Sequence, residues 1–162
     1  MPAHYPGPIQ EDIRDLLVDL LGRGVAADKT TPLVMEEDDP FAIAEYVTDD
    51  DQVGALCIFD GKFAIRAGAA LVMVPSNVAE ESVKKNEVDD QFYEYVQEVV
   101  NILSKLLNSA GTPHLRLREV HKLPGAELPD GVVALRDKPE FRRDFAVTID
   151  GYGDGRFSLL VN

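Results

Sequence analysis

Hydrophobic residues at helical spacing define the first and the longest elements that the chain predicts. Between positions 9 and 21 they recur every three or four residues, and Gly22 follows the last of them. This pattern is typical of an amphipathic helix and its end. A longer segment, about 89–108, has the same periodicity, and Gly111 and Pro113 follow it as helix-ending residues.

Two further helices are predicted between these segments. The run 63–73 contains four alanines among mostly apolar residues, which favours a buried helix. Gly68 lies within this run and weakens its helix propensity, and Pro75 ends it. The polar residues 77–88 predict a short helix.

Extended segments are predicted where Val, Ile, Phe and Tyr gather in short runs between turn residues. We expect strands at 31–36, 42–48, 53–59, 114–122, 131–136, 144–150 and 156–161. Helices in the early and central parts with strands at the end indicate an α+β fold of two layers, with helices packed on a largely antiparallel sheet. Residues 1–8 contain three prolines and predict a disordered N-terminal arm before a single domain, 9–162.

Composition and charge limit the kinds of partner that the protein can bind and indicate where in the cell it is located. The chain has 16 basic and 29 acidic residues, a net charge of −13, which argues against binding to nucleic acid or to an anionic membrane surface. No apolar run approaches the 18 residues of a membrane span, and the N-terminus does not resemble a signal peptide. The sequence therefore predicts a cytoplasmic protein.

Familiar catalytic and metal-binding motifs are not found in the sequence. The three histidines, at positions 4, 114 and 121, are too far apart to predict a metal cluster, and we expect His114 and His121 to face opposite sides of one strand. The acidic run 49–51 predicts a solvated turn, with a metal site as the alternative. The glycine-rich segment 151–155 predicts a hairpin loop rather than a phosphate loop, because a strand follows it. The single cysteine, Cys57, lies in an apolar run and predicts a buried side chain rather than a nucleophile.

The long helix has a polar face as well as a buried one. At 100° per residue, Glu94, Glu98, Asn101 and Lys105 fall within about 60° of one another. Glu94 and Glu98 are like charges one turn apart, and asparagine is a mediocre helix former. From periodicity alone, this face is either an ordinary solvated surface or a functional one.

Three residues of this region resemble a known motif. Glu98 and Asn101, with Pro124 following after 22 residues, match the Glu-x2-Asn-x22-Pro signature of the CheC/CheX/FliY family of chemotaxis phosphatases. The predicted order of elements is also similar to that of CheX. Members with two sites carry a second copy of the motif on the first helix, whereas segment 9–21 contains no asparagine, so the chain resembles the single-site CheX branch.

The resemblance implies an activity, a substrate and roles for residues. The substrate would be the aspartyl phosphate of a CheY-type response-regulator receiver domain. The resemblance also implies a homodimer, which members of the family often form. Asn101 would orient the attacking water, since an amide can both accept and donate hydrogen bonds, and Glu98 would pair with the receiver's active-site lysine. The receiver would supply Mg²⁺, so the chain would need no cofactor or metal ligand of its own. Pro124 would shape the end of a strand.

The chain departs from the family pattern at three positions. Glu94 replaces the usual Asp or Ser, and Gln97 and Lys105 stand where glycine is frequent. We expect Glu94 and Lys105 to lie in the partner-binding surface. Lys105 could hinder docking, stabilise phosphoryl charge or offset the two glutamates. A module of this family that binds a signalling partner without hydrolysis is therefore the alternative function, and an unrelated α+β domain with a coincidental motif is the third hypothesis.

Overall fold

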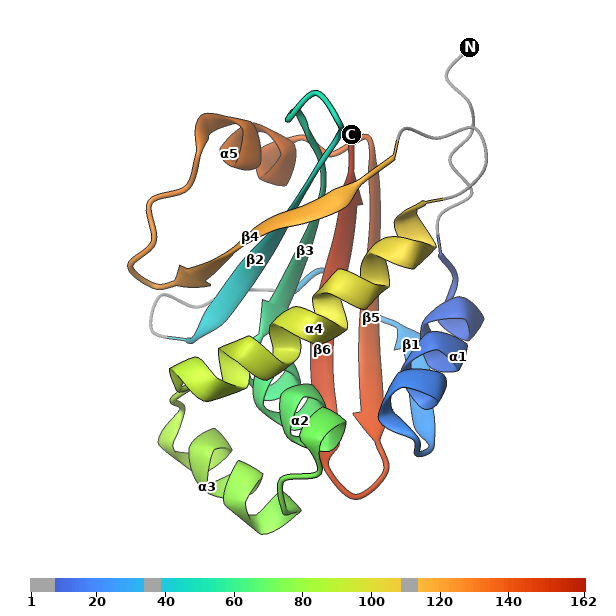
Figure 1. Ribbon diagram of the computed structural model, residues 1–162, viewed down its shortest axis with the longest axis vertical. Helices are drawn as coiled ribbons and strands as arrows, with labels where there is room; N and C mark the ends of the chain where they lie inside the picture. Colours follow the sequence, from blue (N-terminus) through green and yellow to red (C-terminus); the bar gives the residue numbers. More distant parts are fainter. Residues whose placement is uncertain (1–7, 34–38, 109–113) are drawn as a thin grey trace.

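The protein forms a six-stranded sheet with five described helices (Figure 1). The computed structural model describes residues 8–33, 39–108 and 114–162. The helices are α1 (Gln10–Leu21), α2 (Gly61–Val72), α3 (Ser76–Lys85), α4 (Asp90–Leu107) and α5 (Asp130–Asp137). The strands are β1 (Val25–Lys29), β2 (Phe41–Val47), β3 (Val53–Asp60), β4 (Arg116–Leu123), β5 (Phe141–Ile149) and β6 (Gly153–Val161).

All strand pairs of the sheet are antiparallel, in the order β1-β5-β6-β3-β2-β4. Strands β2 and β3 form a hairpin, as do β5 and β6, while β4 pairs with β2 at the opposite edge from β1. The register of β2 against β4 shifts between Glu45 and Tyr46. The predicted α+β class and the antiparallel sheet are therefore confirmed.

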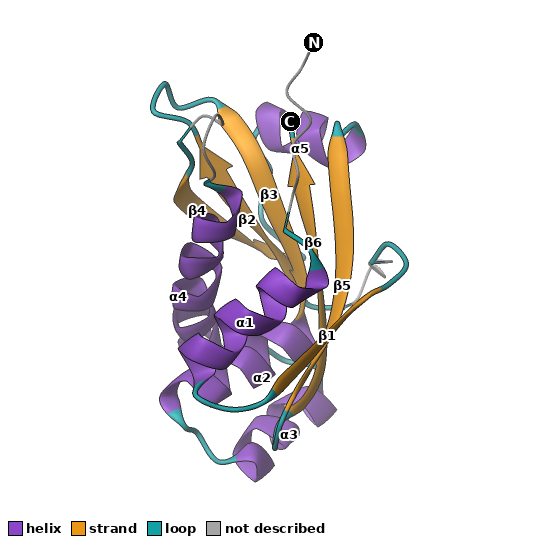
Figure 2. Ribbon diagram, turned by 90° about the vertical axis from the view of Figure 1, so that its right-hand side faces the viewer, coloured by secondary structure: helices purple, strands orange, loops and turns teal. Residues whose placement is uncertain are grey.

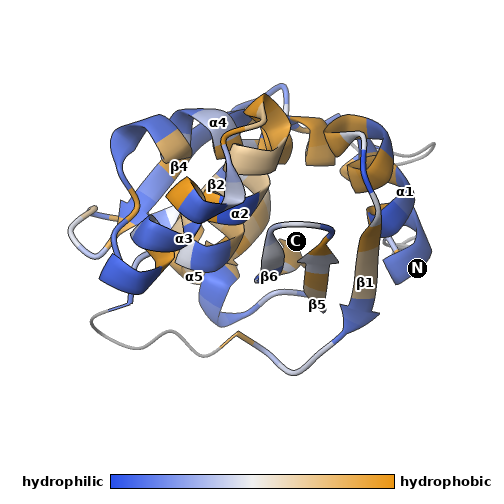
Figure 3. Cartoon of the chain, turned by 90° about the horizontal axis from the view of Figure 1, so that it is seen from below, coloured by the Kyte–Doolittle hydropathy of each residue, from blue (hydrophilic) through white to orange (hydrophobic). Residues whose placement is uncertain are grey.

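The helices divide unequally between the two faces of the sheet. Helices α1, α2 and α4 cover the main core, and α3 packs against α2 (Figures 1 and 2). Helix α1 shows both hydrophobic and hydrophilic residues, as an amphipathic helix does (Figure 3). On the second face, α5 covers a smaller apolar cluster that contains Ile43, Leu56 and Val132. This helix adds a partial third layer to the two that the sequence predicts. Within the described ranges no helix has both the length and the apolar character of a membrane span.

Three predicted or missed strands need correction. Segment 131–136 is not a strand but helix α5, because Val132 and Leu135, three residues apart, are buried on one side of a short helix. Of the expected strand 31–36, residues 31–33 form no strand and the rest lies outside the described residues. Strand β1 was missed because it is a short edge strand with only Val25 buried. Residues 1–7 of the predicted arm also lie outside the described residues, and Pro8 is buried.

Helix α4 is fixed at its beginning, middle and end. The Asp89 side chain accepts a hydrogen bond from the Phe92 amide (2.9 Å) and caps the first turn. The buried Tyr46 hydroxyl donates to the Val100 carbonyl, and burial raises the pKa of Tyr46 well above its usual value, so the hydroxyl remains a donor. At the end, the Asn108 side chain bonds both backbone groups of Leu115, at 2.7 and 2.9 Å.

Close contact with α2 also fixes α4. A Cβ on Gly68 would lie 3.0 Å from the Tyr95 Cβ and 3.2 Å from the Phe92 carbonyl oxygen. Glycine at this position therefore permits the two helix backbones to approach each other. The residue that weakens the propensity of α2 in the sequence is thus the one that allows α4 to pack on it.

We expect Tyr46→Phe to lower the free energy of unfolding by about 0.5–1.5 kcal/mol, because it removes a buried hydrogen bond while keeping the ring. Urea denaturation measures the change. Tyr95→Phe is the matched control: its ring packs against Phe92, and its hydroxyl makes no hydrogen bond to a described residue, so the expected change is within about 0.5 kcal/mol. Equal effects of the two substitutions would contradict an anchoring role for the Tyr46 hydroxyl.

Candidate functional site

The polar face of α4 points away from the core. Four side chains on one side of the helix are exposed: Glu94, Glu98, Asn101 and Lys105. Four on the opposite side have no exposed surface: Val96, Val99, Val100 and Leu103. In Figure 1 the helix crosses the front of the molecule with one side uncovered. The heptad-like spacing of apolar residues therefore determines which polar side chains reach solvent.

The key side chains of this face are free of bonds to the described part of the chain. None of the described residues forms a hydrogen bond or ion pair with the Glu98 carboxylate, the Asn101 amide or the Lys105 ammonium group. The Asn101 carbonyl accepts a hydrogen bond from the Ser104 hydroxyl (2.6 Å), but that bond leaves the side-chain amide open. Glu98 and Asn101 lie about one turn apart, so both can contact the same partner surface.

Pro124, the third residue of the motif, lies away from Asn101. It is exposed directly after β4, two residues beyond Lys122, whose ammonium group contacts the Asp90 carboxylate at 2.8 Å. This contact lowers the pKa of Asp90 and places the end of β4 beside the first turn of α4. Asn101 is eleven residues further on, about 16 Å along the helix axis. Pro124 therefore ends a strand, as expected, and does not share a surface with Asn101.

The other segments considered from sequence have structural explanations. Cys57 is buried, and burial raises the pKa of its thiol, which disfavours the nucleophilic thiolate. The acidic turn 49–51 forms ion pairs with residues at and just before the start of β4, Asp49 with His114 (3.3 Å) and Asp51 with Arg116. Segment 151–155 is part of the β5–β6 hairpin, as predicted.

The structure also brings together three residues that the sequence does not. Glu45, Glu119 and His121 offer donor atoms that lie within 4.8 Å of one another. Strand pairing causes this, because Glu45 lies opposite Glu119 and Ile43 lies opposite His121. The expectation that His114 and His121 face opposite sides of one strand is wrong, because β4 begins at Arg116 and His114 lies before it, exposed. The only sequence signal for this group is a glutamate inside the otherwise apolar strand 41–47.

Comparisons with known proteins identify the fold. No protein-family model matches the sequence, and no curated protein does. Among solved structures, FliY from Thermotoga maritima superposes with a TM-score of 0.58 at 15% identity, covering 92% of this chain and 81% of that one. CheX from Vibrio vulnificus has a TM-score of 0.56 at 13% identity, covering 99% and 97%. FliM in a FliM–SpeE complex from H. pylori has a TM-score of 0.59 at 8% identity, covering 94% and 80%.

The predicted resemblance to the CheC/CheX/FliY family is thus confirmed at the level of the fold. At these identities the likeness establishes architecture alone, and the same architecture occurs in FliM middle domains. The function of this chain must therefore be argued from its own residues.

If Asn101 is a surface residue available to a partner, the fold should not need it. We expect Asn101→Ala to leave the free energy of unfolding unchanged or to raise it by up to about 0.7 kcal/mol, because alanine is the better helix former. Val99→Ala, two residues away on the buried side, should instead lower it by about 1–3 kcal/mol. Urea denaturation of both variants measures this difference. Unfolding of Asn101→Ala would assign its side chain to the structure instead.

Proposed function

We propose that this protein is a cytoplasmic phosphatase of the aspartyl phosphate on a CheY-type receiver domain. The observation that carries this proposal is the pair Glu98 and Asn101, exposed one turn apart on the uncovered face of an anchored helix, in a fold shared with CheX and FliY. An exposed carboxylate and amide without partners in the described chain are free to contact another protein.

Hydrolysis of an acyl phosphate requires little covalent chemistry from the protein. An in-line water must be positioned, and developing charge must be stabilised. The Asn101 amide suits the first task, since its oxygen accepts from water and its nitrogen donates towards phosphoryl oxygens. A carboxylate at the same place would repel the phosphoryl group.

Glu98 and the receiver supply the other parts of the proposed site. Glu98, one turn earlier, would pair with the receiver's active-site lysine and set the register of α4 across the phosphorylated aspartate. Mg²⁺ would be held by the receiver, whose own carboxylates are the hard oxygen ligands that this ion prefers. Glu94 and Lys105 would line the docking surface on either side.

A module that binds a signalling partner without hydrolysis is the second candidate. Two observations favour it: Lys105 is an exposed side chain on the same face as Asn101, and FliM structures of this fold were solved in complexes with FliG and SpeE. The two candidates differ in whether Asn101 acts on a reacting water or only contacts a partner.

The decay of a phosphorylated receiver distinguishes them. We expect this protein to accelerate loss of the phosphoryl group from the receiver. Asn101→Ala removes the amide that positions the water, and Glu98→Ala removes the carboxylate that sets the register of α4 on the receiver, so each should reduce the acceleration at least tenfold. Gln91→Ala is the control, because it shortens an exposed amide in the first turn of the same helix, about 15 Å from Asn101 along the axis, and it should retain the activity. Binding without acceleration would favour the module, and absence of both would contradict the proposal.

We expect Lys105 to attract the phosphorylated receiver rather than to obstruct it, because it is the only basic residue of α4 and the net charge of the chain is −13. Lys105→Glu should raise KM several-fold with kcat changed less than twofold, and added salt should reduce the difference. Lys84→Glu, the same charge change on the exposed side of α3, is the matched control. An activity gain in Lys105→Glu would instead assign steric obstruction to the lysine.

A further inference from the structure

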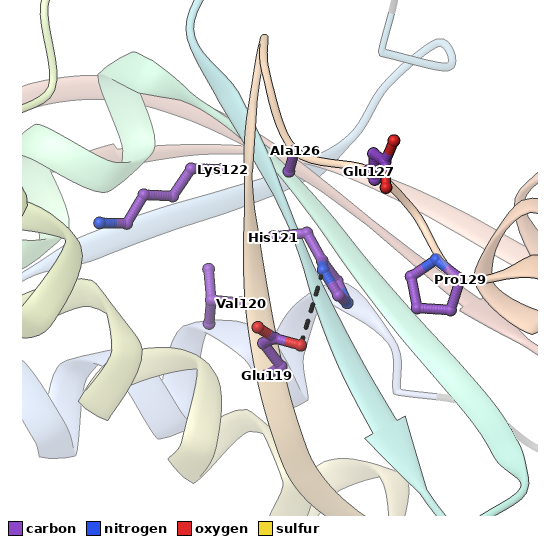
Figure 4. Close-up of a pocket in the computed structure, with 7 residues that line it drawn as sticks. All are labelled: Glu119, Val120, His121, Lys122, Ala126, Glu127 and Pro129. Carbon is purple, nitrogen blue, oxygen red and sulfur yellow. Dashed lines mark ion pairs between the residues drawn. The ribbon is translucent and has the colours of Figure 1, made fainter.

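The second face of the sheet carries a polar cluster where an apolar one would be expected. Glu45 of β2 and His121 of β4 are 2% and 5% exposed, beside the small cluster that α5 covers. Figure 4 shows His121 and Lys122 on opposite sides of β4, with Lys122 directed towards α4. The polar cluster is therefore separated from the Asn101 surface by the sheet itself, and a role for it is independent of the proposed function.

The two ring nitrogens of His121 have different surroundings. Nε2 lies 2.8 Å from Glu45 Oε1, a distance at which Nε2–H donates to the carboxylate in the tautomer that an imidazole bound to a metal through Nδ1 requires. The other nitrogen, Nδ1, then presents its lone pair to the Glu119 carboxylate. The Nδ1–Oε2 distance is 3.9 Å, which is too long for a hydrogen bond. This gap is marked by the dashed line in Figure 4.

We propose that His121 Nδ1 and Glu119 are ligands of a divalent transition-metal ion of the Zn²⁺ class, with Glu45 as the residue that orients the imidazole. Two ligands of a tetrahedral zinc ion lie about 3.4 Å apart, since each bond is about 2.0–2.2 Å long. The gap of 3.9 Å closes to that value by a small movement of Glu119, whose side chain is 64% exposed. A carboxylate that holds the far nitrogen of a ligating histidine is the usual second-sphere arrangement.

The surroundings provide room and charge for the rest of the coordination shell. Glu119 and His121 line a hollow of about 410 Å³ together with the loop from β4 to α5, including Glu127 and Pro129. Water molecules in this hollow can take the remaining positions. Lys122 also lines it, but its ammonium group is held by Asp90. The imidazole donor favours Zn²⁺ or Co²⁺ over Mg²⁺.

The test is a calorimetric titration of the full chain, freed of metal by a chelator, with ZnCl₂ at neutral pH. We expect one saturable ion per chain, and binding at least tenfold weaker for Glu119→Gln. This variant changes an exposed side chain, so it should fold where substitutions of the buried His121 risk unfolding. Glu81→Gln removes the same charge from exposed α3 and should bind as the unmodified chain does.

A second variant tests whether His4 or His114 binds the ion instead of His121. In the double variant His4→Ala/His114→Ala, His121 is the only histidine of the chain, and one ion per chain should still bind, with visible absorption characteristic of nitrogen and oxygen ligands when Co²⁺ is the probe. The proposal is overturned if the unmodified chain shows no saturable binding, if Glu119→Gln binds like Glu81→Gln, if the double variant loses the ion, or if MgCl₂ binds as tightly as ZnCl₂.

Discussion

The packing of α4 on α2 and β2 determines which of its residues reach solvent. Gly68 removes a Cβ that would meet the backbone of α4, and the Tyr46 hydroxyl binds the helix at Val100, one residue before Asn101. Helix α4 contacts the core through both its buried side chains and its backbone, so it cannot rotate about its axis without breaking these contacts. The outward direction of Glu98 and Asn101 is therefore a consequence of the core, although neither residue contributes to it.

Strand β2 connects the two faces of the molecule. Because side chains alternate across a strand, Tyr46 enters the main core and reaches α4, while its neighbour Glu45 lies on the face that α5 covers. A one-residue slip of β2 against β3 would exchange these positions and bury the carboxylate under α4. The register of this hairpin thus determines both that Tyr46 reaches the motif helix and that Glu45 lies on the opposite face.

Features that depend on local periodicity could be predicted from the sequence, and those that depend on strand pairing could not. Helices α1, α2, α3 and α4 were predicted, as were the strands flanked by clear turn residues, and the polar face of α4 follows directly from the spacing of its valines. Helix α5 was mistaken for a strand because Val132 and Val133 are β-branched and an eight-residue element shows too little periodicity to decide. The group around His121 joins residues 76 positions apart, and only the β2–β4 register brings them together.

An exposed helix face places a specific demand on the proposed chemistry. Asn101 lies on the convex surface of α4, where bulk water competes for its amide, and water-excluded surroundings are what make a positioned dipole effective. The receiver would have to provide that enclosure on docking, together with the ion and the lysine. The phosphatase activity would then belong to the complex, and specificity for one receiver would come from the residues around Asn101, namely Glu94, Gln97 and Lys105. The departures from the family pattern occur at these three positions. Selection for a different partner would change such residues while leaving Asn101 and the packing of α4 unchanged.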